Sequence, residues 1–153
     1  MSNATPPDDH EQIRQLLVGY CHTVDRALDA GKIADLSGMY HEDSTFAASW
    51  EDGREHVGRR AVLAWYDEFL GKRVGLRHTR HKISEPEITV DGKTARSRTY
   101  FDADSVDRRD RLRVLCGRYD DELVKDDGTW LIKNRYVTAH YSYTGGETRE
   151  YTG

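Results

Sequence analysis

A histidine near the start of an extended segment is the first residue whose position suggests chemistry. Residues 79–95 read TRHKISEPEITVDGKTA. Ile88 and Val90 alternate with polar residues there, and Asp91-Gly92 is typical of a two-residue hairpin turn. His81 lies in the opening residues of this hairpin. An imidazole can accept a substrate proton when a carboxylate holds its other ring nitrogen, so His81 is a candidate general base.

Asp25 is the carboxylate that could serve as its partner. Apolar residues recur at three- and four-residue steps from Ile13 to Leu28, which predicts an amphipathic helix. Asp25 follows Cys21 by four residues, so it lies about 40° round the helix and flanks the apolar stripe. A carboxylate turned inward needs a hydrogen bond or a cation. We therefore predict that Asp25 orients His81; the alternative is a helix-capping Asp25 and an ordinary strand histidine.

Two other histidines are candidate site residues. His78 precedes His81 by three residues, so on a regular strand the two side chains point to opposite faces and cannot share a metal unless a bulge intervenes. We expect no metal and no cofactor. His140 follows the last predicted strand among aromatic residues (YVTAHYSY) and could close a pocket, or could be an exposed rim residue.

The composition predicts one folded domain, residues 1–153, with a core at about 10–141. The chain has 153 residues, a third of them charged, with three Trp, nine Tyr and three Phe to fill a core. Its net charge of −4 argues against nucleic-acid binding. No apolar run reaches the ~20 residues of a membrane span, and MSNATPPDDH lacks the apolar stretch of a signal peptide, so we expect a cytoplasmic location. Cys21 and Cys116 are expected to be buried free thiols.

Helical patterns come first along the chain and strands afterwards. A second, short helix is expected at Ile33–Met39, followed by a turn at residues 41–43, and a third helix at Val62–Leu70. Strands are expected at residues 44–50, from 77 to the turn at 91–92, and at 95–101, 112–125 and 130–141, with a polar loop at 104–111 and an unpacked tail after 141. This pattern predicts an α+β domain in which three helices cover a strongly bent, mostly antiparallel sheet that encloses a pocket.

Four segments together resemble a known family. YCHTVDR, MYHEDSTF, TRHKISEPEITVDGKTARSRTYF and GRYDDELVKDDGTWLIKNR occur in this order between about residues 12 and 141. The chain thus resembles the SnoaL-like branch of the nuclear transport factor 2-like superfamily. The resemblance implies a cone-shaped α+β barrel with a deep pocket. Members include scytalone dehydratase, ketosteroid isomerases and hexachlorocyclohexane dehydrochlorinase.

The resemblance also implies roles for particular residues. It makes Asp25 and His81 the catalytic pair and Arg135 a pocket arginine that stabilises negative charge. The isomerase aspartate base has no evident counterpart, and Tyr20 and Tyr40 are candidates for a carbonyl-polarising pair by location only. Strict alternation puts Arg135 on the face opposite Trp130 and Ile132, which leaves open whether it faces the pocket.

The function expected from these residues is a cofactor-independent lyase (dehydratase or dehydrohalogenase-like) or isomerase that acts on a small cyclic or aromatic hydrophobic molecule. Alternatives are a non-catalytic ligand-binding protein and a scaffold subunit like the β subunits of ring-hydroxylating dioxygenases. A homodimer or homotrimer is expected, with no nucleic-acid or membrane partner. The candidate substrate-binding residues, each of which could instead be core or rim, are Tyr20, Tyr40, Phe46, Trp65, His78, Tyr100, Tyr119 and His140.

Overall fold

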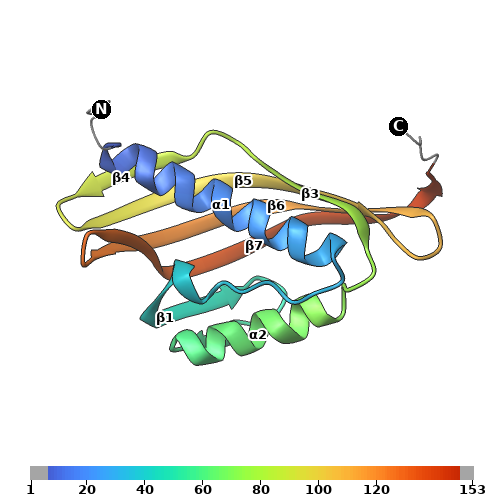
Figure 1. Cartoon of the computed structure of the whole chain (residues 1–153), viewed down its shortest axis with the longest axis horizontal. Helices are drawn as coiled ribbons and strands as arrows, with labels where there is room; N and C mark the ends of the chain where they lie inside the picture. Colours follow the sequence, from blue (N-terminus) through green and yellow to red (C-terminus); the bar gives the residue numbers. More distant parts are fainter. Residues whose placement is uncertain (1–6, 149–153) are drawn as a thin grey trace, which may run out of the picture.

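The computed structural model describes residues 7–148, which form a curved seven-stranded sheet with helices packed on it (Figure 1). The predicted α+β class is confirmed. In chain order the elements are α1 (Asp9–Asp29), η1 (Ser37–Met39), β1 (Tyr40–Ala48), β2 (Glu55–Val57), α2 (Arg59–Gly71), β3 (Arg77–Ile83), β4 (Glu87–Asp91), β5 (Thr94–Val106), β6 (Arg111–Asp126) and β7 (Thr129–Glu147). Neither α-helix of the described range is long and apolar enough to cross a membrane.

The first helix lies lengthwise across one face of the sheet (Figure 1). It begins where the Asp8 side chain accepts a hydrogen bond from the Glu11 backbone N–H at 2.8 Å. Its apolar stripe is buried as the periodicity predicted, with Ile13, Leu17, Tyr20, Cys21, Val24 and Leu28 all in the core. Because this stripe faces the sheet, residues at the edge of the stripe meet the neighbouring strand β3.

The prediction of a second helix at Ile33–Met39 is wrong. Only the single 3-10 turn η1 forms there. The Asp35 carboxylate accepts hydrogen bonds from both the backbone N–H and the hydroxyl of Ser37, at 3.0 and 2.7 Å. Such a local side-chain bond competes with helical bonding, and Gly38 adds little helix propensity. The turn expected at residues 41–43 is also wrong, because those residues belong to β1.

The strands are ordered β2-β1-β7-β6-β5-β3, and β4 also pairs with β5. All pairs are antiparallel except β1 with β7, so the sheet is mixed but largely antiparallel. The predicted hairpin joins β4 to β5, but its two turn residues are Gly92 and Lys93, because Asp91 still belongs to β4 and pairs with Thr94. The single strand expected from residue 77 to this turn is divided into β3 and β4. The expectation of an unpacked tail after residue 141 is wrong, because β7 continues to Glu147, which pairs with Arg111. Residues 149–153 of that tail lie outside the described range.

Two irregularities decide which side chains face the helices. Between β6 and β7, Glu122 pairs with Asn134 but Leu123 pairs with Ile132, so Lys133 is an extra residue. This bulge breaks the alternation and leaves Ile132 and Arg135 both buried. In β3 the register shifts between Arg77 and Arg80, and His78 adopts a left-handed backbone (φ 54°).

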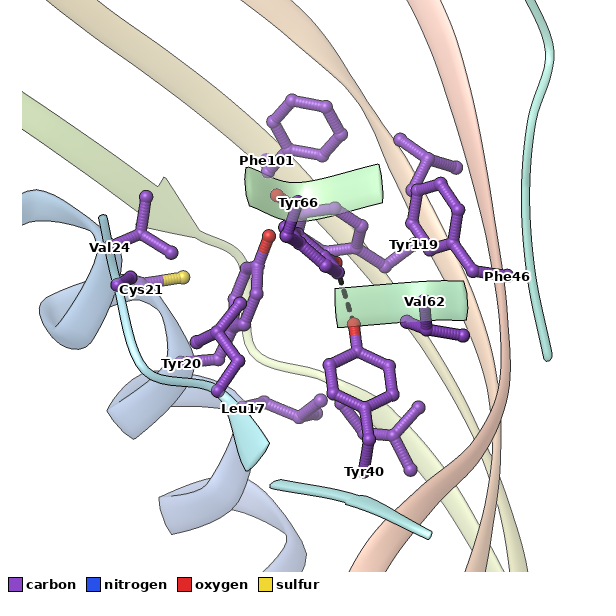
Figure 2. Packing of buried hydrophobic residues seen from close by; sticks show 14 of the residues in the cluster. Leu17, Tyr20, Cys21, Val24, Tyr40, Phe46, Val62, Tyr66, Phe101 and Tyr119 are labelled. Carbon is purple, nitrogen blue, oxygen red and sulfur yellow. Dashed lines mark hydrogen bonds between the residues drawn. The ribbon is translucent and has the colours of Figure 1, made fainter. Parts of the chain in front are cut away.

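The core lies between α1, α2 and the inner face of the sheet. Figure 2 shows Leu17, Tyr20 and Val24 of α1 directed at a cluster of aromatic rings that includes Tyr66, Phe101 and Tyr119. The rings of Phe101 and Tyr119 stack with centroids 4.4 Å apart. Cys21 and Cys116 are both buried and unpaired, so covalent cross-linking plays no part in holding these layers.

The turn between β5 and β6 is organised by one carboxylate. Asp107 accepts hydrogen bonds from the backbone N–H groups of Arg109 and Arg111 and from the Arg111 guanidinium. Burial acts to raise the pKa of Asp107, but these bonds outweigh it and lower the pKa to about 2. The loop expected at residues 104–111 is wrong in its bounds, because β5 continues to Val106 and β6 begins at Arg111.

Asp107→Asn is expected to destabilise the protein in a pH-dependent way. Because the folded-state pKa lies below the usual value of about 3.9, the ionised form contributes stability that is full above the unfolded pKa and is lost as pH falls toward about 2. Urea midpoints of wild type and variant should therefore differ most near neutral pH and converge at about pH 2–3. A difference that stays constant with pH would contradict this account.

Candidate functional site

Two carboxylates of α1 hold the start of β3. Asp29 accepts a hydrogen bond from the Thr79 backbone N–H at 3.0 Å, and Asp25 accepts one from the His81 backbone N–H at 2.9 Å. Four helical residues advance by about 6 Å and two strand residues by about 6.6 Å, so the spacings match. Because Thr79 and His81 alternate with outward residues, both of their side chains face the interior. Asp29 was missed by the sequence analysis, although its position one turn after Asp25 places it on the same helix face.

The carboxylate of Asp25 binds the His81 side chain as well as its backbone. Its Oδ1 lies 2.6 Å from Nδ1 of the ring, while Oδ2 accepts the backbone N–H. Both side chains are about 15% exposed. A carboxylate acceptor places the ring proton on Nδ1, so Nε2 carries the lone pair. No described residue hydrogen-bonds Nε2. The structure thus joins the two predicted residues, whereas their catalytic role stays a prediction.

His81 lines a cavity of about 740 Å³ between the helices and the inner face of the sheet. This volume lies within the range typical of small-molecule sites. The inner wall is apolar and aromatic, formed by Tyr20, Val24, Tyr66, Phe101 and Tyr119, and a second aromatic group comprises Phe46, Trp50, Trp65 and Phe69. Trp65 and Phe69 stack at 4.6 Å between centroids. The cavity can therefore hold a flat or ring-containing molecule next to an oriented imidazole.

Four of the predicted substrate-binding residues line this cavity: Tyr20, Phe46, Trp65 and Tyr119. Asp25 lies behind His81 and does not line it. Tyr66 and Phe69 also contribute and were not predicted as site residues. Both belong to the apolar stripe of α2, and that pattern is equally typical of a core helix, so no separate signal marked them.

The predicted pocket positions of Tyr100, His140 and His78 are wrong. Tyr100 is 53% exposed on the outer face, because its neighbours Thr99 and Phe101 take the inward positions of β5. His140 is the extra residue of a bulge between Ala139 and Tyr141, and its ring meets Tyr100 on the outside. His78 lies in the β3 bulge with an exposed side chain. Among residues 7–148 there is no cluster of three potential metal ligands.

Arg135 faces inward but does not line the cavity. It is 2% exposed and makes a bidentate ion pair with Asp121, its cross-strand neighbour, at 2.7 and 2.8 Å. Its guanidinium packs 4.5 and 4.4 Å from the ring centroids of Tyr20 and Tyr119, which do line the cavity. Burial acts to lower the pKa of Arg135, but the opposite effects, led by that of Asp121, are together larger and raise the pKa above its usual value. The guanidinium therefore keeps its charge. The arginine lies one layer of rings behind the ligand space.

Two tyrosines connect this layer to the cavity. The hydroxyls of Tyr40 and Tyr66 are 2.6 Å apart, as the dashed line in Figure 2 shows. Tyr40 is completely buried and does not line the cavity, whereas Tyr66 does. Burial raises the pKa of Tyr40 well above its usual value, so its phenol stays protonated and can donate to Tyr66. A donated bond would leave the Tyr66 hydroxyl proton free for a ligand.

The chain belongs to the SnoaL-like domain family, whose model matches residues 7–136. A provisionally named scytalone dehydratase from Novosphingobium aromaticivorans is similar in structure, with a TM-score of 0.71, 24% identity, and coverage of 87% of this chain and 85% of that one. A hexachlorocyclohexane dehydrochlorinase (LinA, type 2) has a TM-score of 0.71 and 14% identity over 93% of this chain and 92% of its own. At these identities the likeness shows a common fold. A comparison with curated proteins found no match.

The buried ion pair makes a testable contribution to stability. Asp121→Ala would leave the Arg135 charge unpaired in the core and should lower the free energy of unfolding by about 3–5 kcal/mol. The double variant Asp121→Leu/Arg135→Met removes both charges and should be distinctly more stable than the single variant. Urea denaturation of the three proteins checks this. A single variant as stable as wild type would contradict the burial of the pair.

Proposed function

We propose that the protein is a cofactor-independent lyase or isomerase in which His81 removes a proton from a carbon of a small ring-containing molecule. One observation carries the proposal: the Asp25 carboxylate holds both the backbone N–H and Nδ1 of His81, at 2.9 and 2.6 Å, at the wall of a 740 Å³ cavity. An exposed or unpaired histidine would be neither oriented nor fixed in one tautomer. Here both conditions for a general base are met.

The proposed step moves one proton and one electron pair. Nε2 of His81 accepts a proton from the substrate carbon, and Asp25 stabilises the imidazolium that forms. The electron pair of the broken C–H bond becomes a C=C bond. In an elimination, a leaving group on the adjacent carbon departs with its bonding pair, and the imidazolium then releases its proton to the leaving group or to water. In an isomerisation, the π pair of a double bond already present in the substrate shifts and takes the proton back from Nε2 at another carbon.

Negative charge that develops on the substrate meets the hydroxyl of Tyr66. Tyr66 lines the cavity, and its hydroxyl is hydrogen-bonded to that of the neutral, buried Tyr40. Arg135, whose charge is paired with Asp121, packs behind the rings of Tyr20 and Tyr119 and does not touch the substrate. Preorganised donors and charges of this kind act strongly where water is excluded.

The choice of elimination or isomerisation is supported by the comparisons and by the surroundings of the base. Similar folds carry the names of a dehydratase and a dehydrochlorinase, and both reactions remove a proton and a leaving group from neighbouring carbons. Within the described residues, no cysteine, serine or threonine side chain hydrogen-bonds the His81 imidazole, so none is positioned for activation as a nucleophile. His81 is thus proposed to act directly on the substrate.

Replacing the base should abolish catalysis while leaving the fold intact. His81→Ala is expected to lower turnover by about 100-fold or more, because removal of a positioned general base costs this much or more. Suitable assays are chloride release from hexachlorocyclohexane and hydrogen–deuterium exchange at the acidic carbon of 2-tetralone. His140→Ala, which alters an exposed histidine outside the cavity, is the control. Activity retained in His81→Ala, or absent from wild type in a broad panel of such substrates, would overturn the proposal.

Asp25→Asn tests the orientation of the ring separately. The amide oxygen can still accept the His81 backbone N–H, but its NH2 group would then face Nδ1 and favour the tautomer protonated on Nε2, which cannot accept a proton. We expect a loss of roughly 100-fold in turnover. Asp29→Asn is the matched control, since Asp29 binds only the Thr79 backbone. Equal activity in the two variants would exclude the orienting role of Asp25.

A further inference from the structure

The outer part of the cavity carries a charge opposite to that of the whole chain. The protein has a net charge of −4. The residues that line the cavity nevertheless include six cationic side chains and only two carboxylates, namely Lys72, Arg73, Arg108, Arg109, Arg111 and Arg113 against Asp104 and Asp107. Lys72 and Arg73 follow α2, whereas the other four arginines lie in the turn between β5 and β6 and at the start of β6. The local excess therefore arises because the fold brings two stretches of the chain together.

The two carboxylates do not neutralise this set. Asp107 is bound by Arg111 at 2.9 Å and lies 3.9 Å from Arg113. Asp104 forms ion pairs with Arg80 and Lys82, at 2.8 and 3.0 Å, which are both outside the cavity lining. Within the described residues, Arg73, Arg108 and Arg109 form no ion pair, and Arg113 shares Asp107 with Arg111 at the longer distance, so positive charge remains in excess in the cavity.

Arg73 is the most constrained of these cations. Its guanidinium lies 3.4 Å from the centroid of the Phe69 ring and donates a hydrogen bond to the Phe69 carbonyl at 2.8 Å. It has no carboxylate partner in the described part of the chain. Burial, followed by repulsion from Arg113, lowers the pKa of Arg73. Two like charges held near each other are unfavourable unless an anion lies between or beside them.

The strand register sets the distance from this charge to the base. His81 pairs with Ala103, Ala103 pairs with Leu115, and Arg113 lies two residues before Leu115 on β6. Two strand spacings and two residues along the strand separate the Cα positions of His81 and Arg113 by about 12 Å. The side chains of His81 and Arg113 both extend toward the cavity, so the distance between the imidazole and the guanidinium is shorter and matches the length of one or two fused rings.

We propose that the substrate is a ring-containing molecule with a carboxylate group, which Arg113 and Arg73 bind while the ring system lies among the cavity aromatics and its acidic carbon faces His81. This inference rests on the proposed function and adds the substrate class to it. Guanidinium groups bind carboxylates through paired N–H donors, so they fix orientation as well as charge. The carboxylate would also offset the repulsion between the two arginines.

Calorimetric titration with 2-naphthoate and its neutral analogue 2-naphthamide tests the inference without any need for turnover. Wild type is expected to bind the carboxylate at least about tenfold more tightly, with an advantage that shrinks as salt is raised. Arg113→Gln should reduce this preference severalfold. Arg118→Gln, which removes a β6 arginine paired with Asp120 and absent from the cavity lining, should leave it unchanged.

A second variant guards against an effect of folding. Arg73→Gln should reduce the preference as Arg113→Gln does, with the secondary structure of each variant checked by circular dichroism. Equal affinities for the two ligands in wild type, or no binding of either at millimolar concentration, would overturn the inference. His81→Ala separates this result from the proposed function: it should retain the carboxylate preference while losing catalysis. If wild type prefers 2-naphthoate to 2-naphthamide but abstracts no proton from any substrate, the enzymatic proposal is refuted and the anion site stands.

Discussion

The contact of one aspartate with both the backbone and the ring of a histidine governs the candidate site. Asp25 binds the His81 N–H and Nδ1 together, so the position of β3 relative to α1 and the direction of the imidazole are set by the same carboxylate. Asp29 repeats the backbone contact one helical turn later. Because Asp25 and Asp29 each hold one residue of β3, the strand cannot slide along the helix without breaking both hydrogen bonds. The position of the His81 ring is consequently tied to the packing of α1 on β3.

The cavity is arranged in layers of different polarity. Arg135 and Asp121 form a neutral, fully buried pair at the bottom, and the rings of Tyr20 and Tyr119 cover the guanidinium. Above these rings lie the ligand space and His81, and toward solvent come the arginines of the mouth. Under the proposed function, this order would separate the buried ion pair behind the tyrosine rings from the arginines that could select the substrate.

The rest of the sheet supplies the space for this arrangement. A sheet with strict alternation would carry Arg135 to the outer face, and the bulge at Lys133 prevents this. The bulge in β3 places Thr79 and His81 toward the helices while His78 stays outside. Bulges increase local twist, so the same irregularities that aim these residues also help the sheet to curve. Curvature in turn opens the gap between sheet and helices that the aromatic residues line.

The sequence by itself determined the α+β class, the two long helices and a hairpin near Gly92, because these follow from local periodicity and turn chemistry. The residues alone left the pairing of Asp25 with His81 open against a capping aspartate and an ordinary strand histidine; the family resemblance favoured the pair, and the structure joins the two side chains. The sequence predicted four cavity-lining aromatics but misplaced Tyr100 and His140. Only the tertiary structure decided the inward direction of Arg135, the contact of Tyr40 with Tyr66 and the meeting of residues 72–73 with the arginine-rich run 108–113. Bulges shift the register by one residue without a distinctive sequence signal, and segments far apart in the sequence meet only after the chain has folded.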